Sequence, residues 1–356
     1  MKTSKQTTLV LSGGDVNEIV ENFGLHSLMD RLILKLTTAV LGYDETSMEI
    51  PIRSGFNYNN DKPGLVEFMP VHALGEGIVL KVVGYHPRNP DDYGLPTILS
   101  SITSYDIKTG HLQGIADGVL LTALRTGAAS AVASKFMAQP DSGVLGLIGC
   151  GAQAITQLHA ISRCYPLEQV YIYDVDETVV SSFAERCAML DLHVEIIPSS
   201  ISEIMSKSDI VCTATSIDVG LGPLFETYET KDHLHINAIG SDFPGKIELP
   251  LSLLRKSTVV PDFREQAKLE GECQQLNDEE IGPDLVTLVK NHTDFDHIAN
   301  TLTVFDSTGW ALEDRVVMKV FMDLAEEFNI GMEVSIENTS EDAKNPYHFM
   351  LKTVKA

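Results

Sequence analysis

The segment from residue 144 to 154 carries a glycine pattern that could hold a phosphate group. It reads VLGLIGCGAQA, in which Gly149, Gly151 and Ala154 form G-x-G-x-x-A between a strand-like and a helix-like run. The first glycine allows a tight turn, the second lets the backbone approach a pyrophosphate, and the alanine keeps the helix close to the strand. The N–H groups of the first helical turn would then face the phosphates. This spacing predicts a dinucleotide site, with an ordinary glycine turn as the alternative.

An acidic residue follows at the distance expected for ribose recognition. Asp174 ends the next strand-like run, QVYIYD, about 20 residues after Gly151. A carboxylate there can accept hydrogen bonds from both ribose hydroxyls, and it would repel the extra phosphate of NADP. The sequence therefore predicts NAD as the cofactor.

Several charged residues lie in largely apolar segments or beside a strand end, where a charge needs a partner. Arg can clamp a carboxylate with two hydrogen bonds, and a carboxylate next to a cofactor pocket can act as a general base. The alternatives are a solvated charge or salt bridge for the cations, a structural ion pair with Lys81 for Glu67, and an Asx turn for Asp242. The residues are Arg53 in IPIRSGF, Glu67 in GLVEFMP, Lys81 in IVLKVVG, Arg125 in LLTALRTGAAS and Asp242 in AIGSDFPGK.

The elements that must position these residues follow two patterns. The first third of the chain predicts an antiparallel or mixed sheet, because Pro, Gly and Asn separate its strand-like segments. We expect strands at 8–12, 47–52, 64–70, 77–83 and 97–106, and helices at 15–23, 26–41 and 117–137.

From residue 144 onwards, short apolar strands alternate with helices, which predicts βαβ units and a parallel sheet. We expect strands at 144–148, 169–173, 194–197, 210–214, 233–239, 258–261 and 302–305, and helices at 152–164, 177–190 and 201–207. An amphipathic helix at 311–328 could return to the first domain. The predicted fold is α/β, with a Rossmann domain at 129–308 and an α+β domain formed by 1–128 with 309–356.

Composition excludes some classes of function. The chain has 356 residues and a net charge of −24, which argues against binding to nucleic acid or anionic membranes. Five cysteines without a CxxC pair indicate free thiols in a reducing cytosol. No apolar run is long enough to span a membrane and no signal peptide is evident, so we expect a cytoplasmic protein. The eleven histidines show no metal-binding spacing, and we expect no metal.

The chain resembles the ornithine cyclodeaminase and mu-crystallin family. The resemblance is strongest around residues 64–138, 144–176, 234–250 and 265–314. EGECQQL and VFDSTGWALED look more like the cyclodeaminase branch than the dehydrogenase or crystallin branches. The segments that carry it are GLVEFMP, LKVVGYHPRNP, LLTALRTGAASAVASK, LIGCGAQA, INAIGSDFPGKIEL, KLEGECQQL and VFDSTGWALED.

This resemblance implies a homodimer whose first domain binds an amino acid and makes the dimer contact, and whose Rossmann domain holds NAD. The implied reaction converts L-ornithine to L-proline and ammonia, and it is redox-neutral because NAD takes a hydride from Cα and later returns it. Two alternatives stay open. One is a net oxidoreductase, namely an amino-acid dehydrogenase, a cyclic imine reductase or an opine-type dehydrogenase. The other is a binding protein, as mu-crystallin is for thyroid hormone.

The resemblance also implies a role for individual residues. Arg53, Lys81 and Arg125 would hold the substrate carboxylate, with Lys81 also in the catalytic set. Asp242 would be the base, and Glu67 would position a proton or water. Thr308 would contact the substrate, at a position that is typically apolar in the ornithine enzyme. The implied cofactor contacts are Thr97, Arg125, Thr126, Gly149, Gly151, Ala152, Gln153, Asp174, Thr215, Asn237, Ala238, Ile239, Lys246 and Ser307.

Overall fold

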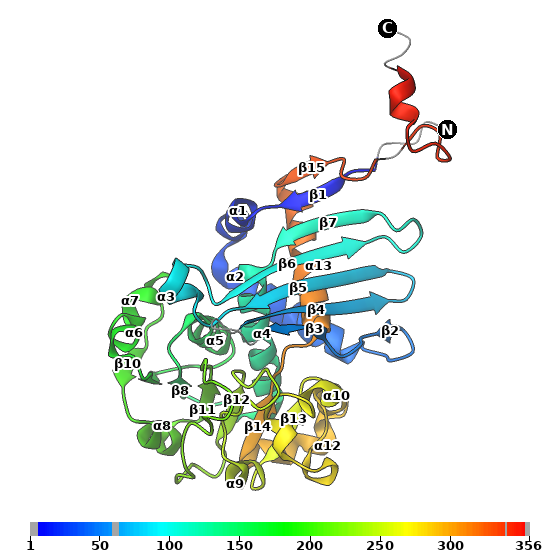
Figure 1. Ribbon diagram of the computed structural model, residues 1–356. Coiled ribbons are helices and arrows are strands. Elements are labelled where there is room, and N and C mark those ends of the chain that lie inside the picture. Colours follow the sequence, from blue (N-terminus) through cyan, green and yellow to red (C-terminus); the bar gives the residue numbers. More distant parts are fainter. Residues whose placement is uncertain (1–5, 59–63, 339, 353–356) are drawn as a thin grey trace.

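The computed structural model describes residues 6–58, 64–338 and 340–352. It contains two β-sheets that lie one beyond the other, with long helices between and beside them (Figure 1). The chain forms the first sheet, then the second, and finally returns to the first through a long helix. This arrangement confirms the predicted α/β class.

The first sheet is mixed, with strand order β15-β1-β7-β6-β5-β4-β2 and with β3 paired to β4. The β1–β7 pair is parallel and its other pairs are antiparallel. Its strands are β1 (Thr8–Leu11), β2 (Met48–Glu49), β3 (Ser54–Tyr58), β4 (Gly64–Ala73), β5 (Gly77–Tyr85), β6 (Ile98–Tyr105), β7 (Leu112–Asp117) and β15 (Met332–Val334).

Four long helices bury apolar faces around this sheet: α1 (Gly13–Phe23), α2 (Leu25–Leu41), α4 (Val119–Met137) and α13 (Ala311–Phe328). In α2, Leu28, Leu32 and Leu36 are four residues apart and so share one buried face. As expected, α13 packs against α2, α4, β4 and β5. It thereby brings the end of the chain beside strands formed near its beginning. After β15, the C-terminal segment stands away from the body (Figure 1).

The second sheet is parallel throughout, with strand order β10-β9-β8-β11-β12-β14-β13. The order reverses between β8 and β11, which is where doubly wound sheets open a crevice for ligands. Its strands are β8 (Val144–Ile148), β9 (Gln169–Tyr173), β10 (Glu195–Pro198), β11 (Ile210–Thr213), β12 (His235–Ala238), β13 (Thr258–Pro261) and β14 (Thr303–Asp306).

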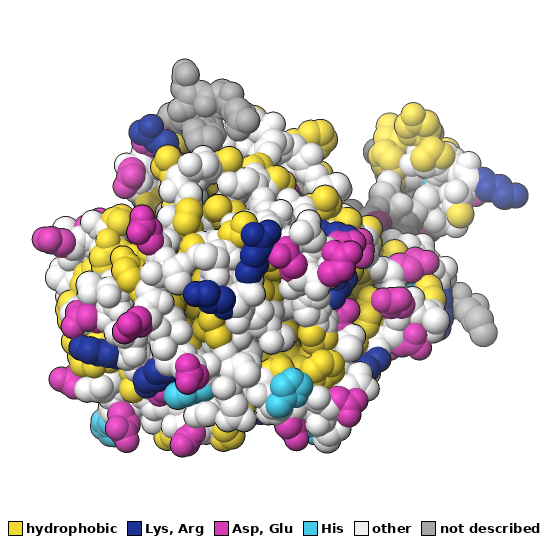
Figure 2. All heavy atoms as spheres, turned by 90° about the horizontal axis from the view of Figure 1, so that it is seen from below, with side chains coloured by type: hydrophobic (Ala, Val, Ile, Leu, Met, Phe, Trp, Pro, Cys, Tyr) yellow, Lys and Arg dark blue, Asp and Glu magenta, His cyan; other side chains and the backbone are white. Residues whose placement is uncertain are grey.

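The remaining helices are mostly short. They are α3 (Asn89–Tyr93), α5 (Ala152–Ser162), α6 (Glu177–Ser181), α7 (Phe183–Arg186), α8 (Ile201–Lys207), α9 (Leu251–Leu254), α10 (Arg264–Ala267), α11 (Leu285–Lys290) and α12 (His292–Phe295). Among the described residues, no helix is both long and apolar enough to cross a bilayer. On the face shown in Figure 2, basic and acidic side chains are interspersed.

Some sequence predictions were wrong. The expected helix at 177–190 is divided into α6, α7 and a short 3-10 segment at 188–190, and Ser182 lies between α6 and α7. The expected strand at 47–52 pairs only over β2, because β4 pairs with β3 further along. The residues between β2 and β3 therefore leave the sheet, and Arg53 lies in this connection. Neither β3 nor β7 was predicted, since their sequences SGFNY and LQGIAD have little apolar alternation.

Candidate active site

The glycine loop after β8 has the shape that a phosphate site requires. Gly149 has φ +93°, and a Cβ there would lie 2.6 Å from the carbonyl oxygen of Ala214. A Cβ at Gly151 would meet no described atom within 4 Å, so the loop is open on that side. No described side chain caps α5, which leaves the N–H groups of Ala152 and Gln153 in its first turn for a ligand. The loop therefore fits a dinucleotide pyrophosphate.

Asp174 follows β9 and contacts this loop directly. Its Oδ2 accepts a hydrogen bond from the Cys150 N–H at 2.7 Å, and its Oδ1 accepts one from the Asp176 N–H at 3.0 Å. A carboxylate has about four acceptor positions, so further hydrogen bonds to ribose hydroxyls are compatible with both contacts. Asp174 thus fixes the loop in addition to its predicted role.

Ser307 lies at the end of β14, at the carboxyl edge of the second sheet. Its N–H donates to the carbonyl of Ala238, which ends β12, at 2.9 Å. Its side chain is buried, and Oγ has no hydrogen-bond partner among the described residues. A buried hydroxyl without a partner is costly, so this atom fits a polar group of a bound cofactor. Ile239 follows Ala238 and is also buried.

Other predicted cofactor contacts are engaged within the protein. Thr215 gives both its N–H and its hydroxyl to Glu248, at 2.8 and 2.7 Å. The Asn237 amide is fully buried and donates to Ser134 at 3.1 Å. Its side chain is therefore engaged within the protein, and contact of Asn237 with the cofactor stays a prediction.

Two threonines that were predicted to contact the cofactor also make hydrogen bonds within the protein. Thr126 lies within α4 and its hydroxyl bonds the carbonyl of Thr122 at 2.9 Å. The carbonyl of Thr97, just before β6, accepts from the His86 N–H at 2.8 Å.

One pocket lies between the first sheet and the carboxyl edge of the second. It brings together the six residues that the sequence proposed for substrate binding and catalysis: Arg53, Glu67, Lys81, Arg125, Asp242 and Thr308. The remaining lining is mostly apolar and comes from Leu65, Met69, Val83, Tyr85, Ile98, Thr122 and Phe243.

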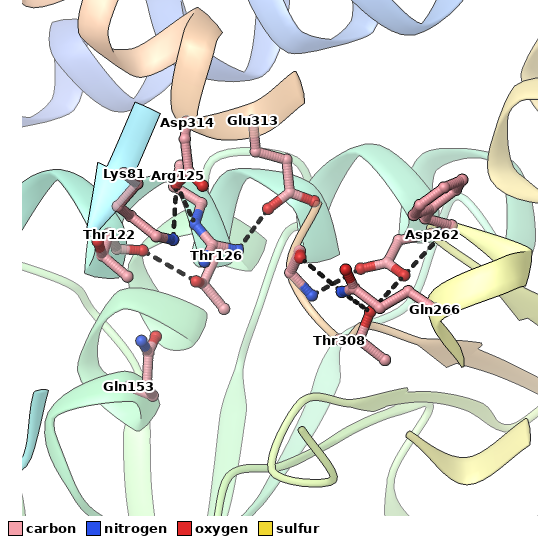
Figure 3. Close-up of polar contacts among 12 residues, drawn as sticks. Lys81, Thr122, Arg125, Thr126, Gln153, Asp262, Gln266, Thr308, Glu313 and Asp314 are labelled. Atoms are coloured by element: carbon pink, nitrogen blue, oxygen red, sulfur yellow. Dashed lines mark hydrogen bonds and ion pairs between the residues drawn. The ribbon is translucent and has the colours of Figure 1, made fainter. Parts of the chain in front are cut away.

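Lys81 and Arg125 are buried side by side and share one carboxylate (Figure 3). Asp314 Oδ1 lies 2.9 Å from Lys81 Nζ and 3.2 Å from Arg125 Nε. Arg125 also pairs with Glu313 through Nη1. Burial and the neighbouring Arg125 charge lower the pKa of Lys81 to about 8. Burial raises the pKa of Glu313 to about 7.

Arg53 is held from several sides. It pairs with Glu67 at 3.3 Å and with Glu270 at 2.8 Å, and it donates to the carbonyls of Thr308 and Gly309. The structural partner of Glu67 is therefore Arg53, and not Lys81 as in the alternative considered from the sequence. Burial raises the pKa of Glu67, and it raises the pKa of Glu270 to about 8.

The Thr308 hydroxyl is bound inside the protein. It donates to Asp262 Oδ1 at 3.1 Å and accepts from Gln266 Nε2 at 2.8 Å (Figure 3). Both bonds run to buried groups, so the hydroxyl proton is already used inside the protein. The departure from an apolar residue at this position therefore adds little polarity to the pocket.

Asp242 lies in the loop after β12, and its side chain is 33% exposed. Lys246 Nζ bonds its Oδ1 at 3.0 Å and lies 5.2 Å from the Tyr85 ring. Lys246 therefore contacts the candidate base, and its place near the cofactor stays a prediction.

The pocket has two poles of opposite charge. Lys81 and Arg125 form a cationic pole, and Glu67 and Asp242 provide carboxylates to the same small space. Sequence reasoning missed the acids beside the cations, although three of them lie in the motifs EGECQQL and VFDSTGWALED and the fourth, Asp262, directly follows β13. The signal was present, since a buried lysine or arginine requires a buried anion. The missed acids are Asp262, Glu270, Glu313 and Asp314.

Comparison with known proteins gives the family of this chain. The ornithine cyclodeaminase/mu-crystallin family model matches residues 15–329. The L-lysine cyclodeaminase of Streptomyces rapamycinicus is 42% identical over 96% of this chain and 99% of its own. The chain belongs to the ornithine cyclodeaminase/mu-crystallin family. Its membership confirms the resemblance inferred from the sequence.

Two solved structures of family members are similar over nearly the whole chain. A lysine cyclodeaminase, studied for its recognition of L-lysine, L-ornithine and L-2,4-diaminobutyric acid, has a TM-score of 0.93 and 45% identity, covering 96% of this chain and 99% of its own. An archaeal alanine dehydrogenase dimer with bound NAD has a TM-score of 0.80 and 30% identity, covering 93% and 100%. The family thus includes NAD-binding enzymes with this fold, as predicted.

Proposed function

We propose that the protein is an NAD-dependent cyclodeaminase of L-diamino acids, which converts L-ornithine to L-proline and ammonia or acts in the same way on a close homologue such as L-lysine. The observation that carries this proposal is the bipolar pocket beside the dinucleotide loop. A diamino acid has one carboxylate and two amines, which complement the cationic pole and the two carboxylates. The similarity to a lysine cyclodeaminase supports the same class of reaction.

The residues that would hold NAD are at the carboxyl edge of the second sheet. The backbone from Gly149 to Gln153 would bind the pyrophosphate, Asp174 the ribose, and Ser307 a polar group further along the cofactor. When bound, NAD supplies a hydride acceptor for the substrate Cα and later gives the hydride back.

Lys81 and Arg125 are suited to hold the substrate carboxylate. Among the described residues, the Lys81 ammonium bonds only Asp314, which leaves two of its three N–H groups for a ligand. Arg125 uses Nε and Nη1 for the acids of α13, so its Nη2 donors remain. Holding the carboxylate from this pole turns the rest of the substrate toward Glu67 and Asp242.

The distal amine must lose a proton before it can act as a nucleophile. An alkyl ammonium has a pKa of about 10.4 in water and is protonated at neutral pH. We assign its proton to Asp242, with Glu67 as the second acceptor, because both carboxylates line the pocket. The neutral amine then adds to the α-imine carbon, and ammonia leaves as the ring closes.

One assay separates this reaction from its alternative. The purified protein is incubated with substoichiometric NAD and with L-ornithine, L-lysine or L-2,4-diaminobutyrate in turn, and ammonia, cyclic product and NADH are measured together. A cyclodeaminase gives many turnovers without NADH accumulation. Stoichiometric NADH release would instead indicate an amino-acid dehydrogenase. No product with any diamino acid would refute the proposal.

The proposal extends to the assembly. We propose a homodimer in the reducing cytosol, with residues 1–128 and 309–356 as the substrate and dimer domain and 129–308 as the NAD domain. The NAD-bound dimer of the archaeal relative and the free state of all five cysteines support it. Size-exclusion chromatography with light scattering tests the dimer.

A further inference from the structure

The turn from Ser307 to Trp310 lies between two of the pocket cations. Arg53 donates to the carbonyl oxygens of Thr308 and Gly309, the latter at 3.0 Å. On the other side, the Arg125 guanidinium lies so close to Gly309 that a Cβ there would be 2.8 Å from Nη1. Gly309 also has φ +88°, which favours glycine. The position of this turn therefore sets the position of both guanidinium groups.

Two buried side chains clamp the turn. Asp262 accepts from the Thr308 hydroxyl at 3.1 Å and from the Gly309 N–H at 2.8 Å. Gln266 donates to the same hydroxyl at 2.8 Å and to the Gly309 carbonyl at 3.0 Å. Figure 3 shows Asp262 and Gln266 on one side of the turn, with Arg125 on the other. Four hydrogen bonds thus fix two consecutive residues.

Asp262 and Gln266 are not among the described residues that line the pocket, and their exposed fractions are 1% and 3%. They are therefore not placed to touch a substrate. Burying a carboxylate and an amide is costly unless both are fully bonded. Asp262 also accepts from the neighbouring Phe263 N–H at 2.6 Å, and Gln266 from the Arg53 N–H at 3.5 Å. Their other bonds run to the turn, so we expect their main effect to be on its geometry.

We infer that Asp262 and Gln266 are positioning residues for recognition of the substrate carboxylate. They act by fixing the Thr308–Gly309 turn between Arg53 and Arg125. This inference rests on the proposed function, since it assumes that the pocket binds an amino acid. A displacement of about 1 Å in a positioning group is enough to cost on the order of 100-fold in rate.

The test measures binding of L-ornithine and L-lysine to NADH-loaded protein by calorimetry, and KM and kcat with NAD. Gln266→Leu should raise Kd and KM at least about 10-fold, with kcat changed less than about 3-fold and NADH affinity unchanged. Gly309→Ala should give the same signature by pushing on Arg125. Gln275→Leu is the matched control, because Gln275 bonds Leu249 and Glu272 instead of the turn.

The outcomes separate the two proposals. Equal amino-acid affinity in the unmodified protein and in Gln266→Leu would overturn the inference. A uniform loss of NADH affinity, kcat and thermal stability in both glutamine variants would also overturn it, since that pattern is merely structural. Amino-acid binding without cyclic product would count against the proposed function alone. Failure of the unmodified protein to bind any amino acid would overturn both.

Discussion

In the proposed function, the pocket recognises charge with buried side chains, whereas the glycine loop recognises it with backbone N–H groups. Lys81 and Arg125 depend on Asp314, which is 233 residues away from Lys81 in sequence. The loop from Gly149 to Gln153 depends on one strand, one turn and one helix. Charge on a side chain responds to pH, to neutralising partners and to substitution, but a backbone donor is permanent. Substitutions and changes of pH should therefore affect substrate binding in the pocket and cofactor binding at the glycine loop differently.

The largest effect should come from Asp242→Asn. An amide cannot accept the proton of the distal ammonium, and loss of a general base costs about 10²- to 10⁴-fold in kcat. Steady-state production of the cyclic product measures this loss, and NAD affinity should stay within about 2-fold because the loop is untouched. An Asp242→Asn enzyme with normal turnover would refute the assigned base.

Substitution of a cation should have the next largest effect. Lys81→Ala or Arg125→Ala should cost at least ~3 kcal/mol in kcat/KM, more than about 100-fold, if the carboxylate pair is desolvated. For Lys81→Ala, an NAD titration should be nearly unchanged, which separates the two ends of the site. Near-normal kcat/KM in this variant would show that Lys81 does not bind the substrate carboxylate.

Cofactor choice should show a smaller effect at the other end. NAD should bind at least about 10-fold more tightly than NADP, because apposed like charges cost several kcal/mol when desolvated and less when partly exposed. Asp174→Ser combined with a nearby arginine should narrow the difference in fluorescence titrations. This variant should also bind NAD more weakly, in part because it loses the hydrogen bond from the Cys150 N–H to the Asp174 carboxylate. Identical curves for both cofactors with the unmodified protein would contradict this assignment.

The smallest effect should be a pH dependence confined to the substrate end. Burial lowers the pKa of Lys81 to about 8, so its positive charge is lost as the pH rises above that value. Amino-acid affinity should fall several-fold between about pH 7 and 9, whereas affinity for NAD should be flat. Lys81→Arg should abolish this fall in amino-acid affinity, since arginine stays charged. A wild-type profile that matches Lys81→Arg would show that Lys81 does not titrate there.

The same contrast explains how far the sequence was informative. β8, β9 and β13 have the predicted bounds, because continuous apolar runs between turn residues determine a buried parallel strand locally. The glycine loop was predicted for the same reason, since all its parts lie within one βα unit. By contrast, β7 was missed because its LQGIAD sequence gains strand structure from its neighbours β1 and β6.

The charged pocket was only half predicted. Each cation could be found singly, because a charge in an apolar run is conspicuous. Its partner could not, because Asp314 and Glu270 reach Lys81 and Arg53 only through the return of α13 and the approach of the two sheets. The pairing of Glu67 with Arg53 was missed because β3, whose pairing with β4 brings the two residues together, was not predicted. Such pairings are properties of tertiary packing and not of spacing.

The long separation between Lys81 and Asp314 has a consequence for the growing chain. Lys81 emerges from the ribosome 233 residues before Asp314, its carboxylate partner near the start of α13. Until then, burying the lysine would leave its charge without compensation. The first sheet can thus complete its core only after the second sheet has been made. We therefore expect the second sheet to finish folding before the first.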